Sequence, residues 1–465
     1  MGEYEIDLSR PASDIISELK KKSISLESWS NLIKEYDPLE HEILKDKMGR
    51  KDKLRSDNSI DKAARITLGL EKLLVKRMVE FMFAIPVKRV YHNIDGNETR
   101  KKIAHAMELI YKHARIDAEN IKRAEMYFAS CEMFTIWYTV EKQNTLYGFP
   151  SKYKLKCKTF SPMNGCELYP LIDERDDMLA QSFEYKKKIG DTEVTFFETF
   201  TSSKHYVWKH TSSGYELVGE PQDISIKKIP GAYAYRLNAL YYGLKCLREE
   251  AEYTISRASD TLAYNATPIL KVVGSLEGTE NKGESARIFR VQNGGDVGYV
   301  SWSQSIEALK YQVDMLLNMY WTQSQMPDIS FNNMMKLGGI GFDARQTLLT
   351  DAHLKVGDES GMWLEFFERE CNVIKAFMGE MNVEWKNELD NIEVEHIITP
   401  FIQNDEKLEI EKWITASGGK AIMSQLDAIK NAGYSSNPED TLKRINEETA
   451  QESAVRMNSI LESAM

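Results

Sequence analysis

The chain has 465 residues, more than one hydrophobic core usually holds, so we expect roughly two to four folding units. Apolar residues make up 42% and charged residues 28%, as in a soluble globular chain and unlike a disordered one. The 60 basic and 71 acidic side chains leave a formal net charge of −11. A protein that wraps duplex DNA carries a basic surplus, so composition argues against that class, but not against a protein past which DNA must slide.

The cysteines and the apolar stretches indicate in which compartment the protein is expected. There are 5 cysteines with no CxxC pair, so neither a disulfide framework nor a zinc ribbon is indicated. The first residues, Met1 to Ile6, lack the basic and apolar regions of a secretion signal. The most apolar stretch, Met78 to Ile85, is much shorter than the roughly 20 residues of a membrane span. We expect free thiols, a reducing compartment and no membrane partner.

The first segment, residues 1–57, is expected to be a partly mobile N-terminal arm. One or two short helices are predicted between Leu8 and Tyr36, ahead of a basic run from Lys45 to Arg55. This run indicates a solvated arm, or alternatively a phosphate-contacting or docking arm that orders on assembly.

Helices are predicted next, followed by strands. Apolar residues at helical spacing predict a helix over 60–83 that Pro86 stops, and two more helices over 98–114 and 117–135. From 152–158 the period changes to two, and the lysines on one face are typical of a protected edge strand. Further strands are predicted at 182–188, 193–200 and 204–210, with a hairpin turn at Ser212–Gly214.

Two long helices are predicted to flank a small β module. From Leu237 to Leu262 apolar residues step by three and four, which predicts a helix of about 30 residues, roughly 45 Å long, ended by Pro268. Strands are expected near 269–273, 286–292 and 297–302. A polar loop, 274–285, separates the first two. A return helix follows over 304–325, so the helices should lie side by side with the β module at their far tip.

The C-terminal part begins with a glycine-rich loop, Met334–Gly341. Asp343 and Gln346 resemble a capping box for a long helix, which we expect to be interrupted and kinked at 357–361. A strand is predicted over 392–402, and a helical, acidic tail follows it.

The sequence offers no catalytic centre. No HExxH or HxH pair occurs, and lone histidines such as His353 and His396 suit ordinary polar or packing roles. The loop Gly278–Ser285 has its lysine before the second glycine, which is the wrong position for a phosphate-binding P-loop. We therefore expect no enzyme, no metal and no cofactor.

The order of predicted elements resembles the portal (head-to-tail connector) protein of tailed bacteriophages, of the type found in phages with long tails. The likeness spans about 58–448. It is carried by Asn58–Ile60 leading to Ile85-Pro86, by Asp296–Val300 with Met326–Ile329, by Phe401–Glu411, by Met423–Gln425, by Ala432–Tyr434 and by Asn437–Glu448. Gly341-Phe-Asp-Ala344 stands where the family usually has a Ser-Gly pair.

The resemblance implies an α+β, portal-like fold with an α/β wing, long paired stem helices, a small β-rich clip, a long kinked helix and a helical C-terminal crown. It places the wing at 58–232, stem helix 1 at 233–266, the clip at 267–303, stem helix 2 at 304–326, the tunnel loop at 327–342, the kinked helix with a returning wing strand at 343–400, and the crown at 401–465.

The resemblance also implies a ring, commonly of twelve copies, at one capsid vertex of a virion assembled in the host cytoplasm. Its channel would pass double-stranded DNA in packaging and ejection. The implied partners are the terminase large subunit, the major capsid and scaffolding proteins, and a head-completion or tail adaptor protein. The expected channel residues are Asn332, Asn333, Lys336, Gly338, Gly339 and Gly341, and the expected partner-binding residues of the clip are Lys282, Arg287 and Arg290.

Two other classes fit parts of this pattern. Another ring-forming structural or scaffold protein of a phage particle would also use long helices and an acidic tail. An enzyme with an unrecognised site would turn over a substrate as a monomer or dimer, so the mass in solution separates these classes.

Overall fold

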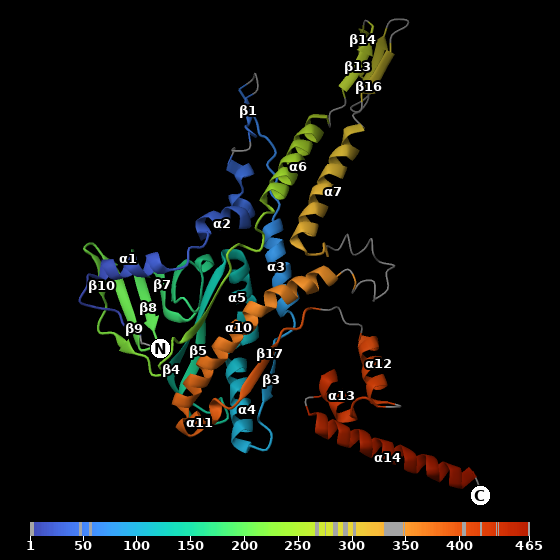
Figure 1. Cartoon of the computed structure of the whole chain (residues 1–465). Coiled ribbons are helices and arrows are strands. Elements are labelled where there is room, and N and C mark those ends of the chain that lie inside the picture. Colours follow the sequence, from blue (N-terminus) through green and yellow to red (C-terminus); the bar gives the residue numbers. More distant parts are fainter. Residues whose placement is uncertain are drawn as a thin grey trace. The chain divides into compact units, whose positions relative to one another are not determined.

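The computed structural model describes residues 4–45, 49–54, 58–265, 269–274, 276–281, 287–291, 296–300, 304–329, 347, 349–401, 406–418, 421–433, 435 and 437–463. It divides into two compact units, Met1–Met335 with Leu349–Phe401, and Lys336–Leu348 with Ile402–Met465. The first unit mixes helices and strands, as predicted, and the second is helical where it is described (Figure 1). None of the described helices is long and apolar enough to span a membrane.

The N-terminal segment is packed where it is described. The two predicted short helices are confirmed as α1 (Ala12–Lys22) and α2 (Trp29–Tyr36). α1 buries an apolar face against the larger sheet, and α2 buries Leu32 and Tyr36 in the main core. Short turns and a small hairpin follow: η1 (Pro38–Glu40), η2 (Glu42–Lys45), β1 (Lys53–Leu54) and β2 (Ile60–Asp61).

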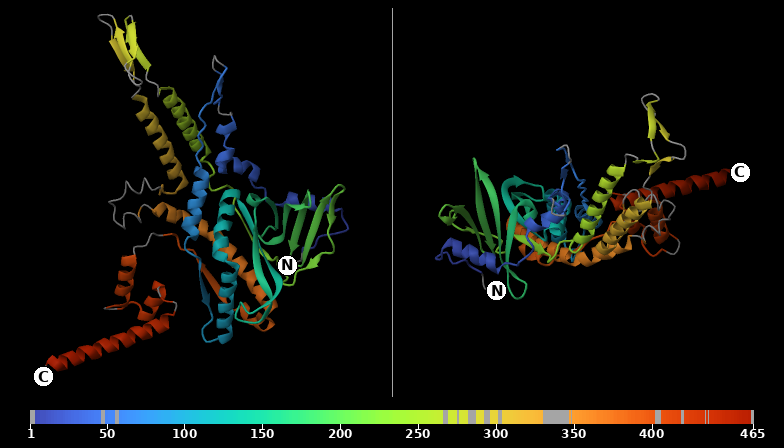
Figure 2. Two further views of the ribbon diagram at one scale, coloured as in Figure 1. Left: turned by 180° about the vertical axis from the view of Figure 1, so that it is seen from behind. Right: turned by 90° about the horizontal axis from the view of Figure 1, so that it is seen from above.

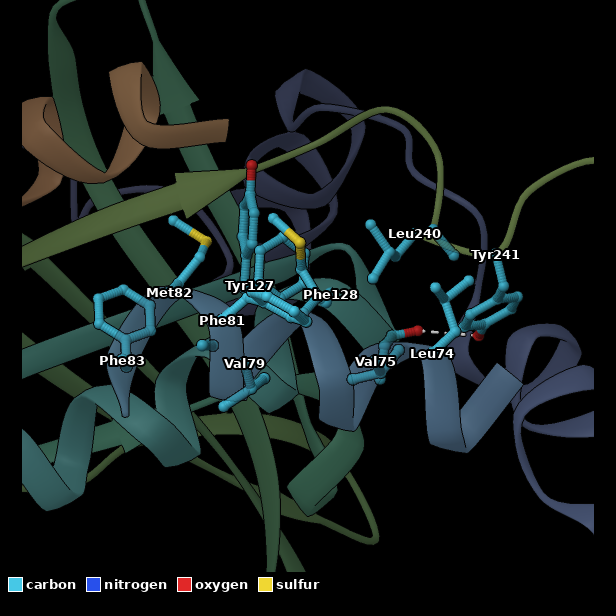
Figure 3. Packing of buried hydrophobic residues seen from close by; sticks show 14 of the residues in the cluster. Leu74, Val75, Val79, Phe81, Met82, Phe83, Tyr127, Phe128, Leu240 and Tyr241 are labelled. Carbon is cyan, nitrogen blue, oxygen red and sulfur yellow. Dashed lines mark hydrogen bonds between the residues drawn. The ribbon is translucent and has the colours of Figure 1, made fainter. Parts of the chain in front are cut away.

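The main core forms around α3 (Leu70–Phe83), which is apolar on most of its surface. Figure 3 shows Phe81 of this helix beside Tyr127 and Phe128 of α5 (Ile116–Ser130), and Leu74 beside Tyr241. Tyr241 also belongs to this core, and its Oη donates a hydrogen bond to Ala129 O at 3.0 Å. The prediction of a helix from residue 60 is wrong for 60–69, because β2 pairs with β1 and the amides of Ala64, Ile66 and Leu68 donate to side chains of another helix.

A three-stranded sheet stands beside two helices, α4 (Glu98–Ala114) and α5 (Ile116–Ser130). Its order is β12 (Gly231–Tyr235), β4 (Glu132–Asn144), β5 (Ser151–Phe160), so the lysine-bearing strand is an edge strand, as predicted. α4 confirms the predicted bounds. α5 ends earlier than predicted because the following residues enter β4 and pair with β12. At Gly231 the strands β12 and β4 lie so close together that a Cβ atom on this residue would be 2.5 Å from Thr135 O.

The larger sheet is antiparallel, in the order β10-β9-β8-β7-β6, with β11 on β9. Its strands are β6 (Cys166–Ile172), β7 (Met178–Ile189), β8 (Thr192–Thr201), β9 (Lys204–Thr211), β10 (Gly214–Leu217) and β11 (Gln222–Asp223), with η3 (Pro162–Asn164) ahead of them. β7, β8, β9 and the turn before Gly214 confirm the sequence prediction. β4, β6, β10 and β12 were not predicted.

Two long helices, α6 (Lys245–Asn265) and α7 (Gln304–Ser324), flank short strands (Figures 1 and 2). The expected start of the first helix near 233 is wrong, because 231–235 is committed to β12 and the chain to 244 is irregular. The strands are β13 (Ile269–Val273), β14 (Leu276–Asn281), β15 (Arg287–Val291) and β16 (Asp296–Val300). β13 pairs with β16, and β14 pairs with β15, so the expected polar loop at 274–285 contains a strand.

The first unit closes with α10 (Thr350–Met381), which packs against α3 and β12. The helix is continuous through Gly357 and Gly361, so the predicted interruption is wrong, while a bend there stays a prediction. Each helical glycine costs about 1 kcal/mol, which burial of Val356 and Trp363 offsets. Then come η4 (Val383–Trp385), α11 (Lys386–Leu389) and β17 (Glu393–Ile397), which pairs with β3 (Lys88–His92).

The second unit contains three described helices, as the acidic tail predicted. They are α12 (Glu406–Ser417), α13 (Gln425–Ala432) and α14 (Pro438–Ser463). α13 ends at Gly433, which has a φ of 74° and so supplies the left-handed residue that commonly terminates a helix.

Candidate functional site

The paired helices α6 and α7 carry the β strands at one end and lead to the glycine-rich loop at the other. The predicted stripe on α7 is confirmed at Leu316 and Tyr320, whose exposed fractions are 8% and 0%. Gln312 Nε2 of α7 donates to Thr254 Oγ1 of α6 at 3.4 Å. The helices therefore form a packed pair in which α6 is also covered on a second surface.

That second surface is covered by an extended segment, residues 62–68, which we call the brace. Three amides of the brace, two residues apart, donate to three side chains of α6 that are four residues apart. The pairs are Ala64 N to Asp260 at 2.8 Å, Ile66 N to Ser256 at 2.9 Å, and Leu68 N to Glu252 at 2.7 Å. Two extended residues advance about 6.6 Å and four helical residues about 6 Å, so the two repeats match. This match explains why 62–68 is extended although its apolar spacing looks helical.

Arg50 fastens the start of the brace. Its side chain is 7% exposed, Nε donates to Ala64 O at 2.9 Å, and Nη2 pairs with Asp260. The interpretation of the whole basic run as solvated is therefore wrong for Arg50. A buried guanidinium needs partners that the sequence alone did not identify.

A buried charged network lies beneath the brace. Arg248 of α6 donates to Glu71 Oε1 through Nε and to Glu252 Oε2 through Nη1, both at 2.8 Å. His41 Nδ1 lies 2.6 Å from Glu252 Oε1. None of the four side chains is more than 1% exposed. One arginine thus holds two buried carboxylates, and the network ties the N-terminal segment and α3 to α6.

Burial shifts the protonation equilibrium of Glu71 in this network. It raises the pKa of Glu71 to about 7, although the adjacent Arg248 favours the charged carboxylate. Arg248 is therefore the group that offsets the cost of keeping carboxylates away from water.

The chain leaves α7 through a held turn just before the glycine-rich loop. Arg77 of α3 donates to Pro327 O at 3.0 Å and to Asp328 Oδ1 at 3.2 Å, and its guanidinium lies 4.3 Å from the centroid of the Trp321 ring. Gln325 takes a left-handed φ of 56° there, which stops the helix before Pro327. The loop therefore starts from a fixed point.

Lys355 of α10 holds the same turn from another side. Its Nζ donates to Ser324 O, one of the carbonyls that the end of α7 leaves without a helical partner. Burial lowers the pKa of Lys355 to about 8. A cation at a helix C-terminus is stabilised by the helix dipole, so Lys355 helps to fix where α7 ends.

The six residues predicted to face a channel lie outside the described residues. They are Asn332, Asn333, Lys336, Gly338, Gly339 and Gly341. The structure describes the loop only as far as Ile329, and the chain resumes as a continuous segment at Leu349.

The predicted partner-binding arginines lie on one short strand. In the pairing of β14 with β15, Arg287 is opposite Asn281 and Arg290 is opposite Gly278. Lys282 lies outside the described residues, so the grouping of the three cations stays a prediction.

α7 presents an exposed apolar row. Tyr311 is 72% exposed, and Met315 and Met319 are each 43% exposed. Together with four polar neighbours they line an open groove of about 460 Å³, formed by Tyr311, Asp314, Met315, Asn318, Met319, Thr322 and Gln323. Exposed apolar rows of this kind are typical of contact surfaces.

The described residues contain no group of three or more His, Cys, Asp or Glu side chains that could hold a metal ion. The two histidines considered from the sequence have packing roles. His353 Nε2 lies 3.1 Å from Phe401 O, and burial lowers the pKa of His396 to about 4.

Sequence reasoning missed the brace, the buried network and the held turn. The spacing of Arg248 and Glu252, four residues apart, could have indicated an ion pair on one helix face. No local pattern could have indicated Glu71, Arg77 or Lys355, because their partners are remote in sequence.

Comparisons with known proteins identify the family. Among solved structures, a chain from the neck of an empty GTA particle, computed with C6 symmetry, is similar at 10% identity over 78% of this chain and 89% of that chain, with a TM-score of 0.35. No curated protein matches the sequence. The family described as phage portal protein, SPP1 Gp6-like, matches residues 13–454, nearly the whole chain. The chain therefore belongs to the phage portal protein family of the SPP1 Gp6-like type.

Proposed function

We propose that this portal protein forms a ring of twelve copies at one capsid vertex, and that DNA enters and leaves the phage head through the ring. The observation that carries the proposal is the family match over residues 13–454. Portal proteins are structural, so the family also supports a role without catalysis.

The domain assignment belongs to the proposal. We assign the wing to 58–244, which now includes β12 and the irregular chain after it, and stem helix 1 to 245–266 in place of the expected 233–266. The clip is assigned to 267–303, stem helix 2 to 304–326, the tunnel loop to 327–342, the long helix and returning strand to 343–400, and the crown to 401–465. Helices α6 and α7 support the stem assignment, because a lone copy leaves the apolar row of α7 exposed. In the proposed ring, the neighbouring copy covers this row through a heterologous contact.

Weak DNA contact follows from the charge. The chain carries a formal net charge of −11, so the attraction of the ring for phosphates is low, which suits a channel that must release DNA as it moves. In the proposed tunnel loop Lys336 is the only basic residue, and twelve copies would place a sparse ring of positive charge around the duplex.

The held turn supports the loop assignment. Arg77 and Lys355 fix the chain at 324–328, so movement of the loop would begin after that point. Gly338, Gly339 and Gly341 would then allow several backbone conformations, including positive φ, at little cost.

The partners are proposed from the same assignment. The clip, with Lys282, Arg287 and Arg290, would meet the terminase large subunit during packaging and the head-completion or tail adaptor protein afterwards. The major capsid and scaffolding proteins would surround the ring during assembly in the host cytoplasm.

Packaging assays on two loop variants test the channel. We expect Lys336→Glu to lower the amount or retention of packaged DNA with rings intact, because it reverses the only positive charge of the loop. Gly339→Val should also lower packaging, because valine restricts the backbone. Normal DNA content in both variants, with normal rings, would contradict the tunnel assignment.

A further inference from the structure

A pocket of about 360 Å³ lies where α4 meets α5, beside β3, away from the paired helices and the loop. Its walls are formed by Arg89, Glu108, Tyr111, Lys112, Arg115, Asp117 and Ala118. Three of these side chains are basic and two are acidic, so the pocket has a net positive charge in a chain that is acidic as a whole.

Arg89 is a buried cation whose counterion, Asp117, lies beyond hydrogen-bond distance. Its side chain is 8% exposed, and its Nε has no hydrogen-bond partner. The carboxylate that approaches it, Asp117 Oδ1, is 3.8 Å from Nη2, which is beyond hydrogen-bond distance. The guanidinium also lies 3.9 Å from the centroid of the Tyr111 ring. A buried donor left unmatched is unfavourable, so an acceptor in the pocket would relieve this cost.

The neighbouring groups do not supply a negative charge that pairs closely with Arg89. His396 lies opposite Arg89 in the pairing of β17 with β3, and burial, together with the charges of Arg89 and Lys375, lowers its pKa to about 4, so its neutral ring adds no counter-charge. Glu108 accepts a hydrogen bond from Tyr91 Oη at 2.8 Å.

The pocket also contains the start of a helix. α5 begins at Ile116, directly after Arg115 in a left-handed conformation with φ 55°, and no side chain caps its first turn. The first amides of a helix have no partner within it, and they carry the positive end of the helix dipole. Since Asp117 and Ala118 of this turn line the pocket, the amides and the buried guanidinium both favour an anion there.

We propose that this pocket binds a small oxyanion of the phosphate or carboxylate class. Arg89 forms the buried part of the site, the start of α5 adds backbone donors, and Lys112 and Arg115 add positive charge at the exposed rim. Asp117 opposes binding, because its carboxylate occupies the same region with the same sign of charge as the ligand.

Calorimetric titration of inorganic phosphate into the full-length protein tests the site, with acetate as a second probe and sodium chloride at matched ionic strength as the blank. We expect saturable binding of phosphate above the chloride background. Arg115→Gln and Lys112→Gln should each weaken binding by about tenfold, the loss of one charge-assisted contact. Lys102→Gln, which removes an exposed cation of α4 outside the pocket, is the matched control and should bind as the wild type does.

Two variants separate a binding site from a structural role. Arg89→Gln should abolish binding, and if it does not fold, the two rim variants decide the question. Asp117→Asn should strengthen binding several-fold, which loss of structure would not do. Absence of phosphate binding to the wild type, or rim variants that bind as Lys102→Gln does, would overturn the proposal.

Discussion

Replacing Arg248 with methionine tests whether the buried network holds the N-terminal segment and α3 to α6. The substitution keeps the apolar part of the side chain and removes the one cation between Glu71 and Glu252. Both carboxylates are at most 1% exposed, so they would remain buried without their arginine. Breaking a buried ion pair in this way costs about 3–5 kcal/mol.

The expected loss is measurable as a fall in the unfolding temperature. At roughly 2 °C per kcal/mol, the low end for large domains, Arg248→Met should lower Tm by about 6–10 °C. Arg257→Met, at an exposed position on the same helix, is the matched control and should change Tm little. Differential scanning fluorimetry on both variants, beside the wild type, gives the comparison.

The pH dependence identifies charge as the cause. Burial already raises the pKa of Glu71 to about 7 with Arg248 present, and removing Arg248 would raise it further. Glu71 of the variant would then take up a proton as pH falls, so the deficit of the variant against the wild type should shrink from pH 8 to pH 5. Adding Glu71→Gln and Glu252→Gln to Arg248→Met should recover most of the stability. A deficit equal to that of Arg257→Met, or one independent of pH, would refute the reasoning.

Three further outcomes are expected. Leu316→Asp should prevent folding or ring assembly, because it buries an unpaired charge on the packed side of α7; a wild-type ring yield by negative-stain imaging would show that the buried face of α7 is misplaced. Glu132 accepts from Tyr233 Oη, and burial raises its pKa to about 7; its contribution to stability is therefore greatest below pH 4.5 and falls as pH rises to 7, by up to about 3 kcal/mol. Glu132→Gln should remove that part of the pH dependence of Tm, and an unchanged slope would contradict this. Arg77→Ala should speed trypsin cleavage at Lys336, within the loop 327–342, while rings persist; cleavage at the wild-type rate would mean that Arg77 does not hold the turn.

The sequence predicted the regular elements best where periodicity was long and uninterrupted. α4, α7 and β7 to β9 lie close to their predicted bounds, because their buried positions repeat at 3.6 or 2 residues. The same reasoning failed where remote partners override local pattern. The brace, residues 62–68, was predicted to be helical, but its amides at Ala64, Ile66 and Leu68 bond to α6. Residues 231–235 pair with β4 and so belong to a sheet.

The candidate site was likewise predicted only in part. The paired helices and the strands β13, β15 and β16 were predicted from order and spacing, whereas β14 lies where a polar loop was expected. The family assignment agrees with the resemblance. The residues that hold the site together were not predicted, because Arg248 with Glu71, and Arg77 with Pro327, meet across 177 and 250 positions of sequence. The predicted channel residues from Asn332 to Gly341 stay a prediction, since the loop lies outside the described residues.

The mass of the purified full-length protein tests the central claim most directly. Native mass spectrometry across a range of salt and protein concentration should show a closed ring near twelve copies, the proposed assembly in which a neighbouring copy covers the exposed row of α7. Monomers or two-fold dimers alone under all of these conditions would contradict the account.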